Sequence, residues 1–172
     1  MSTAQGIRGR DVLFLLAAAA GMLGDLVSKQ LVFHACESQR FVDVVPFVFG
    51  IQCSRNSGAL FGVGQRMGPL FVGLSIVAII LIPLMHRRFV RTADLWQAFG
   101  LGAIEAGALG NLYDRLVYGS VRDFLVLHWG PHAWPTFNVA DALICAGLAA
   151  LFISTCRKPH RDGPPTAAQG PS

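Results

Sequence analysis

The sequence predicts a helical membrane protein, with four transmembrane helices and a small β element outside the bilayer. Of its 172 residues, 53% are hydrophobic and only 14% are charged, whereas a soluble domain usually carries about 25% charged residues. Four apolar runs approach the roughly 20 residues that a helix needs to cross the hydrocarbon core. Two intervening segments alternate between apolar and polar residues, as short strands do. The expected fold class is an all-α membrane protein with this β element and a short extracytoplasmic helix or loop.

The four expected spans are residues 11–33, 68–86, 95–113 and 139–156. The first is interrupted late by Asp25 and Lys29, and the third holds Glu105. The third is also rich in Gly and Ala, and small residues let helices approach closely in a bilayer.

The N-terminal run has a second interpretation. Arg8 and Arg10 precede the apolar stretch Val12–Leu23, and a basic start followed by an apolar run is typical of a cleaved signal peptide. The apolar character resumes after Asp25, which favours an uncleaved span.

The basic residues predict the orientation in the membrane. Eight Lys and Arg residues lie on one side of a four-span chain, and five on the other. Because cytoplasmic loops carry the excess of Lys and Arg, both termini are expected in the cytoplasm. Residues 157–172 are rich in Pro, Gly and polar residues, which predicts a disordered cytoplasmic tail. Residues 1–156 then form a single membrane domain.

The first extracytoplasmic segment contains two alternating stretches, 41–45 and 47–51, and the second contains 124–129. These predict short strands. Cys36 and Cys53 fall in the first segment and either pair or stay free, since spacing alone does not show geometry. The cysteines have no zinc-site spacing, so no metal or other cofactor is expected. The basic residues form no aromatic-interleaved stretch, which argues against nucleic-acid binding.

Two aspartates, Asp123 and Asp141, adjoin the apolar runs. A charged residue at the bilayer centre costs about 3 kcal/mol, so acids close to spans usually serve a function. Two carboxylates that share one proton can activate water. Asp123 is alternatively a solvated turn residue, and Asp141 a first-turn acid favoured by the helix dipole. Their common side of the membrane favours an intramembrane aspartyl protease, and leaves open which aspartate is ionised.

Further polar residues gather at the same depth. Asp25 and Lys29 are four residues apart on one helix face, where they either orient their neighbours or neutralise each other, with Lys29 extended to the interface. Asn111, Asp114 and Arg115 end the third run, and their Asp–Arg pair is alternatively a surface ion pair.

Two asparagines also have local explanations. Asn56 lies in an ordinary turn sequence, and Asn138 is a candidate helix N-cap. Glu105 lies about 120° around the helix from Asn111 and has no evident partner in the sequence.

A small transporter or proton-relay subunit is the main alternative function, because intramembrane acids suit it equally well. Such a protein is expected to carry acids in a ladder across the membrane. Here the polar residues gather at one depth, and only Glu105 departs from it. A non-enzymatic scaffold leaves the amides and Arg115 unexplained.

Five sequence blocks, taken together and in order, resemble the bacterial lipoprotein signal peptidases (signal peptidase II). The blocks are Asp25-Leu-Val-Ser-Lys29, Asn56-Ser-Gly-Ala-Leu-Phe61, Gly107-Ala-Leu-Gly-Asn-Leu-Tyr-Asp-Arg115, Val121-Arg-Asp-Phe124 and Phe137-Asn-Val-Ala-Asp141. The resemblance covers residues 11–156. Three residues depart from the family pattern: Leu60, Glu105 and Ala106.

The resemblance implies a four-helix membrane fold with a periplasmic β-cradle, in the cell inner membrane. It implies removal of signal peptides from diacylglyceryl-modified prolipoproteins, just before the lipidated cysteine, at a site near the extracytoplasmic face. Asp123 and Asp141 would be catalytic. The residues around or supporting the site would be Asn56, Asn111, Arg115, Asn138, Asp25, Lys29 and Asp114. A monomer in contact with membrane lipids, inhibited by globomycin-type cyclic peptides, is also expected.

Overall fold

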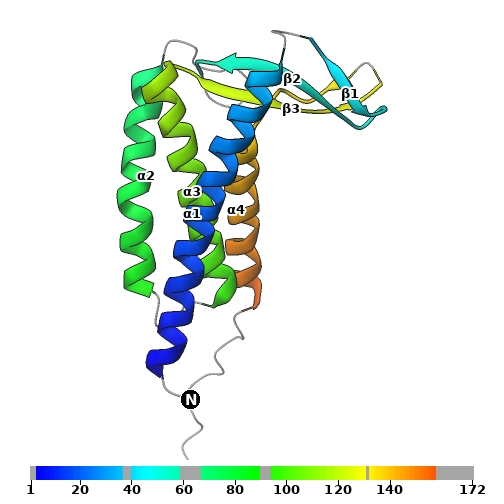
Figure 1. Ribbon diagram of the computed structural model, residues 1–172. Coiled ribbons are helices and arrows are strands. Elements are labelled where there is room, and N and C mark those ends of the chain that lie inside the picture. Colours follow the sequence, from blue (N-terminus) through cyan, green and yellow to red (C-terminus); the bar gives the residue numbers. More distant parts are fainter. Residues whose placement is uncertain (1–2, 37–39, 59–66, 90–93, 131, 158–172) are drawn as a thin grey trace, which may run out of the picture.

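The computed structural model describes residues 3–36, 40–58, 67–89, 94–130 and 132–157. Four helices stand side by side, and a small sheet covers one end of them (Figure 1). The helices are α1 (Thr3–Ala35), α2 (Gly68–Phe89), α3 (Leu95–Tyr118) and α4 (Val139–Arg157). The tail expected after residue 157 lies outside the described residues.

Among the residues that the structure describes, three helical segments are long and apolar enough to cross a membrane: Gly9–Ala35, Gly68–Phe89 and Val139–Arg157. The third expected span corresponds to α3, which is not among them. Its 24 residues include Glu105, Asn111, Asp114 and Arg115, and these polar side chains lower its hydropathy. The chain is therefore a multi-helix membrane protein in which a span at α3 remains a prediction.

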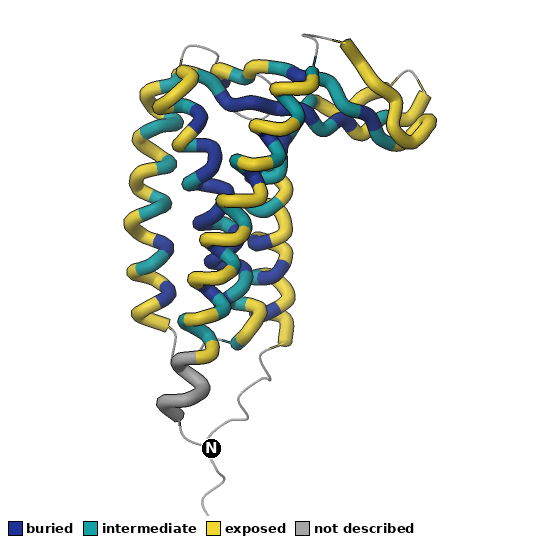
Figure 2. Tube along the Cα trace, in the orientation of Figure 1, coloured by how far each residue is buried: buried dark blue, intermediate teal, exposed yellow. Residues whose placement is uncertain are grey.

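Helix α3 lies at the centre, and each of the other three helices packs against it. Its inner faces are the most buried part of the bundle (Figure 2). Close approach to α4 depends on Gly100 and Gly147. A Cβ atom on Gly100 would lie 2.8 Å from the Gly147 carbonyl oxygen, and one on Gly147 would lie 2.6 Å from the Gly100 oxygen. The Gly- and Ala-rich sequence thus serves helix packing, as it does in bilayers.

The outer helices expose apolar side chains. In α2 only Ile82 and His86 are buried, while Leu74, Ile80 and Leu84 are exposed. An all-round apolar helix with little burial suits contact with lipid, where every backbone polar group is satisfied inside the helix.

The sheet is antiparallel with strand order β1-β2-β3-β4. Its strands are β1 (Val42–Val45), β2 (Phe49–Asn56), β3 (Val121–Trp129) and β4 (His132–Ala133). The predicted strands are present, but β2 runs on to Asn56 and β3 begins at Val121. Asp123 therefore lies within a strand, paired with Ser54, and the interpretation of Asp123 as a solvated turn residue is wrong. The described residues 40–58, 119–130 and 132–138 contain no short helix, and residues 59–66 and 131 lie outside the description.

A disulfide joins Cys36, just after α1, to Cys53 in β2, with 6.4 Å between the two Cα atoms. The two alternatives for this pair are thereby resolved in favour of the bond. The cross-link ties the sheet to the end of the first helix.

Candidate active site

The end of the bundle below the sheet collects nearly all the polar residues that the sequence singles out. They come from five elements: Asp25 and Lys29 from α1, Asn56 from β2, Asn111, Asp114 and Arg115 from α3, Asp123 from β3, and Asn138 and Asp141 from the start of α4. Glu105 alone lies elsewhere, farther along α3.

Asp123 is almost fully enclosed, with 1% of its surface exposed. Its Oδ1 accepts a hydrogen bond of 2.6 Å from Asn138 Nδ2, and its Oδ2 accepts one of 3.0 Å from Asn56 Nδ2. The strand register explains the second bond, because Asn56 pairs with Val121 and so stands diagonally across from Asp123 on the same face. Burial, and then the charge of Asp141, raise the pKa of Asp123 to about 6, while the two amide hydrogen bonds lower it.

Asp141 belongs to a reciprocal cap at the start of α4. The Asp141 backbone N–H donates to Asn138 Oδ1 (3.0 Å), and the Asn138 N–H donates to Asp141 Oδ2 (3.2 Å). This is the capping-box arrangement, in which the N-cap and N3 residues bond to each other. Asn138 is therefore an N-cap, as its place in the sequence predicts. Its side-chain nitrogen takes no part in the cap and donates to Asp123. One side chain fixes both the helix start and the carboxyl group.

Asn111 completes a chain of amides between the two carboxyl groups. Its Nδ2 donates to Asp141 Oδ1 at 2.8 Å. Its Oδ1 accepts from Asn138 Nδ2 at 3.2 Å and from Lys29 Nζ at 3.1 Å. Two donors on the oxygen fix which way the Asn111 amide faces, so its nitrogen is directed at Asp141.

Four buried charges support this chain. Lys29 Nζ lies 2.7 Å from Asp25 Oδ2 and 3.4 Å from Asp114 Oδ2. Arg122 binds Asp114 through its side chain at 2.8 Å and its backbone N–H at 2.9 Å. Asp25 Oδ1 accepts from the Ala140 N–H at 2.8 Å, which holds the first turn of α4. Two acids thus balance two bases.

Lys29 does not extend to the interface, because its side chain is fully buried and its ammonium group contacts Asn111. Asp114 is fully buried and pairs with Lys29 and Arg122, so the alternative of an Asp114–Arg115 surface pair is also wrong. Arg115 donates instead to the backbone oxygens of Asn111 (3.3 Å) and Gly58 (3.4 Å). Sequence reasoning missed Arg122, whose only signal is its place beside Asp123 in a strand of buried residues.

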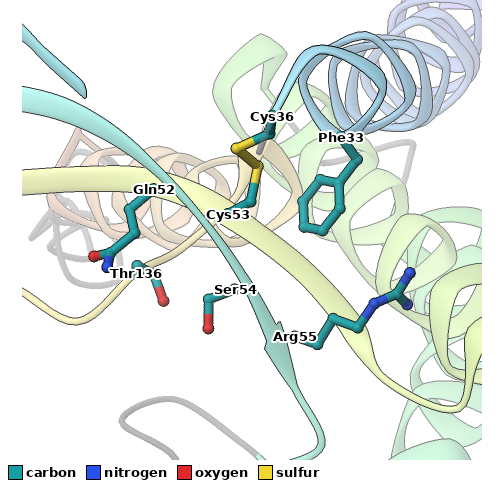
Figure 3. A pocket seen from close by; sticks show the side chains of 7 residues that line it. All are labelled: Phe33, Cys36, Gln52, Cys53, Ser54, Arg55 and Thr136. Atoms are coloured by element: carbon teal, nitrogen blue, oxygen red, sulfur yellow. A yellow bond between two sulfur atoms is a disulfide. The ribbon is translucent and has the colours of Figure 1, made fainter. Parts of the chain in front are cut away.

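Two cavities adjoin this site. A cavity of about 220 Å³ reaches Asp141 and is otherwise mostly apolar, lined by Leu127, Trp134, Pro135, Thr136, Phe137, Ala142 and Cys145. A larger one, of about 750 Å³, is lined by the disulfide, Phe33, Gln52, Ser54, Arg55 and Thr136 (Figure 3). Within the described ranges, no three His, Cys, Asp or Glu side chains converge as a metal site. The arrangement offers a paired carboxyl site beside one apolar and one polar cavity.

Comparison with known proteins identifies the family. Residues 17–157 match the family described as Signal peptidase (SPase) II. A Geobacter metallireducens protein named lipoprotein signal peptidase is 36% identical over 87% of this chain and 94% of its own. One of the same name from Nitratidesulfovibrio vulgaris is 40% identical over 84% and 90%.

A solved structure supports the fold. A bacterial membrane enzyme determined in meso at 2.3 Å resolution superposes with a TM-score of 0.76 at 24% identity, covering 87% of this chain and 91% of the other. The sequence-based recognition is thus confirmed, and with it a hydrolytic function in place of a transporter. The chain belongs to the signal peptidase II family, the aspartic proteases that remove signal peptides from prolipoproteins.

Proposed function

We propose that Asp123 and Asp141 are the catalytic pair of this protease. The observation that carries the proposal is the amide chain Asn138–Asn111, which binds both carboxyl groups and fixes them relative to each other. Side chains held in this way need no rearrangement before reaction. Asn56, Asn111 and Asn138 orient the pair, Asp25, Lys29 and Asp114 hold those amides, and Arg115 fixes the adjoining backbone.

The environments of the two aspartates suit different protonation states. Asp141 lies at the positive end of the α4 dipole and accepts from two N–H groups, which suits a carboxylate. Asp123 has a pKa raised to about 6, first by burial, which suits a proton donor. Acid–base pairs in proteases and glycosidases are separated by their surroundings in the same way.

The reaction then follows with balanced protons. Asp141 takes a proton from water as its oxygen attacks the scissile carbonyl carbon, and Asp123 gives its proton to the carbonyl oxygen. In the tetrahedral intermediate, Asp123 recovers the hydroxyl proton as the carbonyl re-forms. Asp141 gives its proton to the departing amine nitrogen, and the C–N bond breaks. General acid–base help of this kind contributes about 10²–10⁴-fold.

The substrate is a prolipoprotein cleaved just before its lipidated cysteine. The apolar cavity beside Asp141 suits apolar residues of the signal peptide, and the polar cavity over the sheet suits the chain that follows the cysteine. Globomycin-type cyclic peptides inhibit by competing for this site.

The chain crosses the inner membrane four times as a single domain, with α3 as the remaining span and both termini in the cytoplasm. The protein acts as a monomer, and its site is near the extracytoplasmic face. The disulfide beside the site supports this side, because disulfides persist in oxidising compartments. Reporter fusions after residue 130 should give an external signal, and fusions after residue 90 an internal one. The reverse pattern would overturn the orientation.

The catalytic assignment is tested by Asp123→Asn and Asp141→Asn. Each keeps size and hydrogen bonding but removes the titratable proton, so turnover of a lipidated prolipoprotein should fall at least about 100-fold. Asp43→Asn is the matched control, because Asp43 is an exposed aspartate that pairs with His128 away from the site. If either site variant keeps a tenth of the parental rate in folded protein, the assignment fails.

A further inference from the structure

A second polar cluster lies on the half of the bundle away from the sheet. It consists of Asp11 on α1, His86 on α2 and Glu105 on α3. His86 Nε2 lies 2.8 Å from Asp11 Oδ1, and the His86 ring stacks on Phe14 with centroids 4.4 Å apart. None of these residues contributes to the site below the sheet.

Two atoms of this cluster are left without partners. Glu105 is 6% exposed and His86 is 3% exposed. Glu105 Oε2 and His86 Nδ1 are buried and have no hydrogen-bond partner in the described part of the chain. A buried polar group without a partner costs about 1–3 kcal/mol, so such atoms point to a molecule that satisfies them.

Both side chains line one cavity of about 670 Å³, a volume typical of a ligand site. Apolar walls come from Ala18, Met22 and Leu109, and Arg87 also lines it. Helices α1 and α2 both pack on α3, and they contact each other through His86, which pairs with Asp11 and stacks on Phe14. The cavity is therefore a groove over α3 between α1 and α2, at the end that bears the basic last turn of α2.

The residues that line the groove change from charged at its opening to apolar farther in. Arg87 is exposed, and the side chain of Asp11 is 45% exposed, so a cation and an anion stand near the opening. From Asp11 to Met22 the wall of α1 extends about 16 Å at about 1.5 Å per residue. A ligand that fits carries an anionic and a cationic group at one end and a long apolar chain at the other.

We propose that this groove binds an aminophospholipid, a membrane lipid with a phosphate, a primary ammonium group and acyl chains. The phosphate pairs with Arg87 and the ammonium with Asp11. The ammonium and the glycerol ester oxygens supply donors and acceptors for Glu105 and His86, and an acyl chain lies along Ala18, Met22 and Leu109. The fit rests on the groove alone and is independent of the catalytic assignment.

Lipid binding is measured on the purified, delipidated full chain by native mass spectrometry and by thermal shift. Phosphatidylethanolamine should bind at least about tenfold more tightly than phosphatidylcholine, which has no ammonium N–H, and than phosphatidylglycerol, which has no cation. The headgroup alone, phosphoethanolamine, should bind far more weakly than the whole lipid, because it lacks the acyl chain.

Two substitutions should weaken phosphatidylethanolamine binding about tenfold each. Glu105→Leu removes the deep polar atoms, and Asp11→Asn removes the anion at the opening together with the preference for a primary ammonium group. Because Asp11 is partly exposed, its variant keeps the test valid if Glu105→Leu does not fold. Asp43→Asn removes the same charge far from the groove and should bind like the parent.

Three results would overturn the proposal. Equal binding of the three lipids would indicate general contact with the bilayer. Unchanged binding in both variants would mean that the lipid binds at another place on the protein. Displacement of the lipid by a lipidated prolipoprotein, or equal binding of phosphoethanolamine alone, would assign the groove to another ligand.

Discussion

The two buried polar clusters of this bundle differ in how fully their hydrogen bonds are satisfied. Below the sheet, Asp123, Asn138 and Lys29 each have at least two partners. In the groove, Glu105 Oε2 and His86 Nδ1 have none among the described residues. A satisfied network fixes geometry, which a catalytic site needs, whereas unsatisfied atoms await a ligand. Substitutions in the two clusters should therefore act with opposite signs on stability.

The largest effect is expected from Lys29→Met. It leaves Asp25 and Asp114 buried without their shared cation, and removing one partner of a buried ion pair costs about 3–5 kcal/mol. The free energy of unfolding, measured by denaturant titration in detergent, should fall by that amount. Asp43→Asn is the control, because the Asp43 side chain is 41% exposed in its pair with His128 and an exposed ion pair contributes at most about 1 kcal/mol. An equal loss in both variants would show that burial of the Lys29 ion pairs does not cause the effect.

Substitutions of Asn138 separate its two roles. Asn138→Ser keeps a capping oxygen but loses the donor to the buried Asp123 carboxyl group, so the free energy of unfolding should fall by about 1–3 kcal/mol and kcat about 10- to 100-fold. Asn138→Ala loses the cap as well and should be less stable than Asn138→Ser by about 1 kcal/mol. A serine variant with full activity would show that the 2.6 Å bond to Asp123 is dispensable.

The opposite sign is expected for Glu105→Leu. The change removes a buried atom without a partner, so the delipidated protein should be more stable by about 1 kcal/mol in a denaturant titration. A loss of stability similar to that of Lys29→Met would mean that Glu105 belongs to a satisfied network.

The smallest effect concerns pH. The raised pKa of Asp123 means that folded protein holds this proton more tightly than the unfolded chain. The associated stability is full below about pH 4 and is lost as pH rises through about 6. With Asp123 as the proposed proton donor, kcat/KM, which reports the free enzyme, should also fall above about pH 6.

Asn56→Ala should move that alkaline limb to higher pH, because the Asn56 hydrogen bond lowers the pKa of Asp123. The comparison is a pair of pH profiles of kcat/KM for parent and variant. A shift to lower pH would contradict the assignment of Asp123 as the acid.

Local sequence predicted the parts of the site that depend on local spacing. The four-residue spacing of Asp25 and Lys29 gives their ion pair, and the three-residue spacing of Asn138 and Asp141 gives the cap. Contacts between segments far apart in the sequence could not be predicted from local spacing. Lys29 reaches Asn111, 82 residues later, and the expectation that it extends to the interface failed for that reason.

Strand boundaries were the other weak point of the sequence-based prediction. Alternation around Phe124 located a strand, but the start of β3 at Val121 depends on pairing with Asn56 across the sheet. Arg122 was missed because its partner, Asp114, lies in a helix. The groove cluster was not predicted from the sequence, because Asp11, His86 and Glu105 are on three different helices.

The disulfide has a consequence for the order of assembly. Both of its cysteines precede every residue of α3, β3 and α4, and chains emerge from the ribosome N-terminal end first. Both halves of the link between α1 and β2 therefore leave the ribosome before the second half of the protein. It can close while the segments that carry Asp123 and Asp141 are still being synthesised, in which case these segments complete the polar site against a helix and a strand that are already cross-linked.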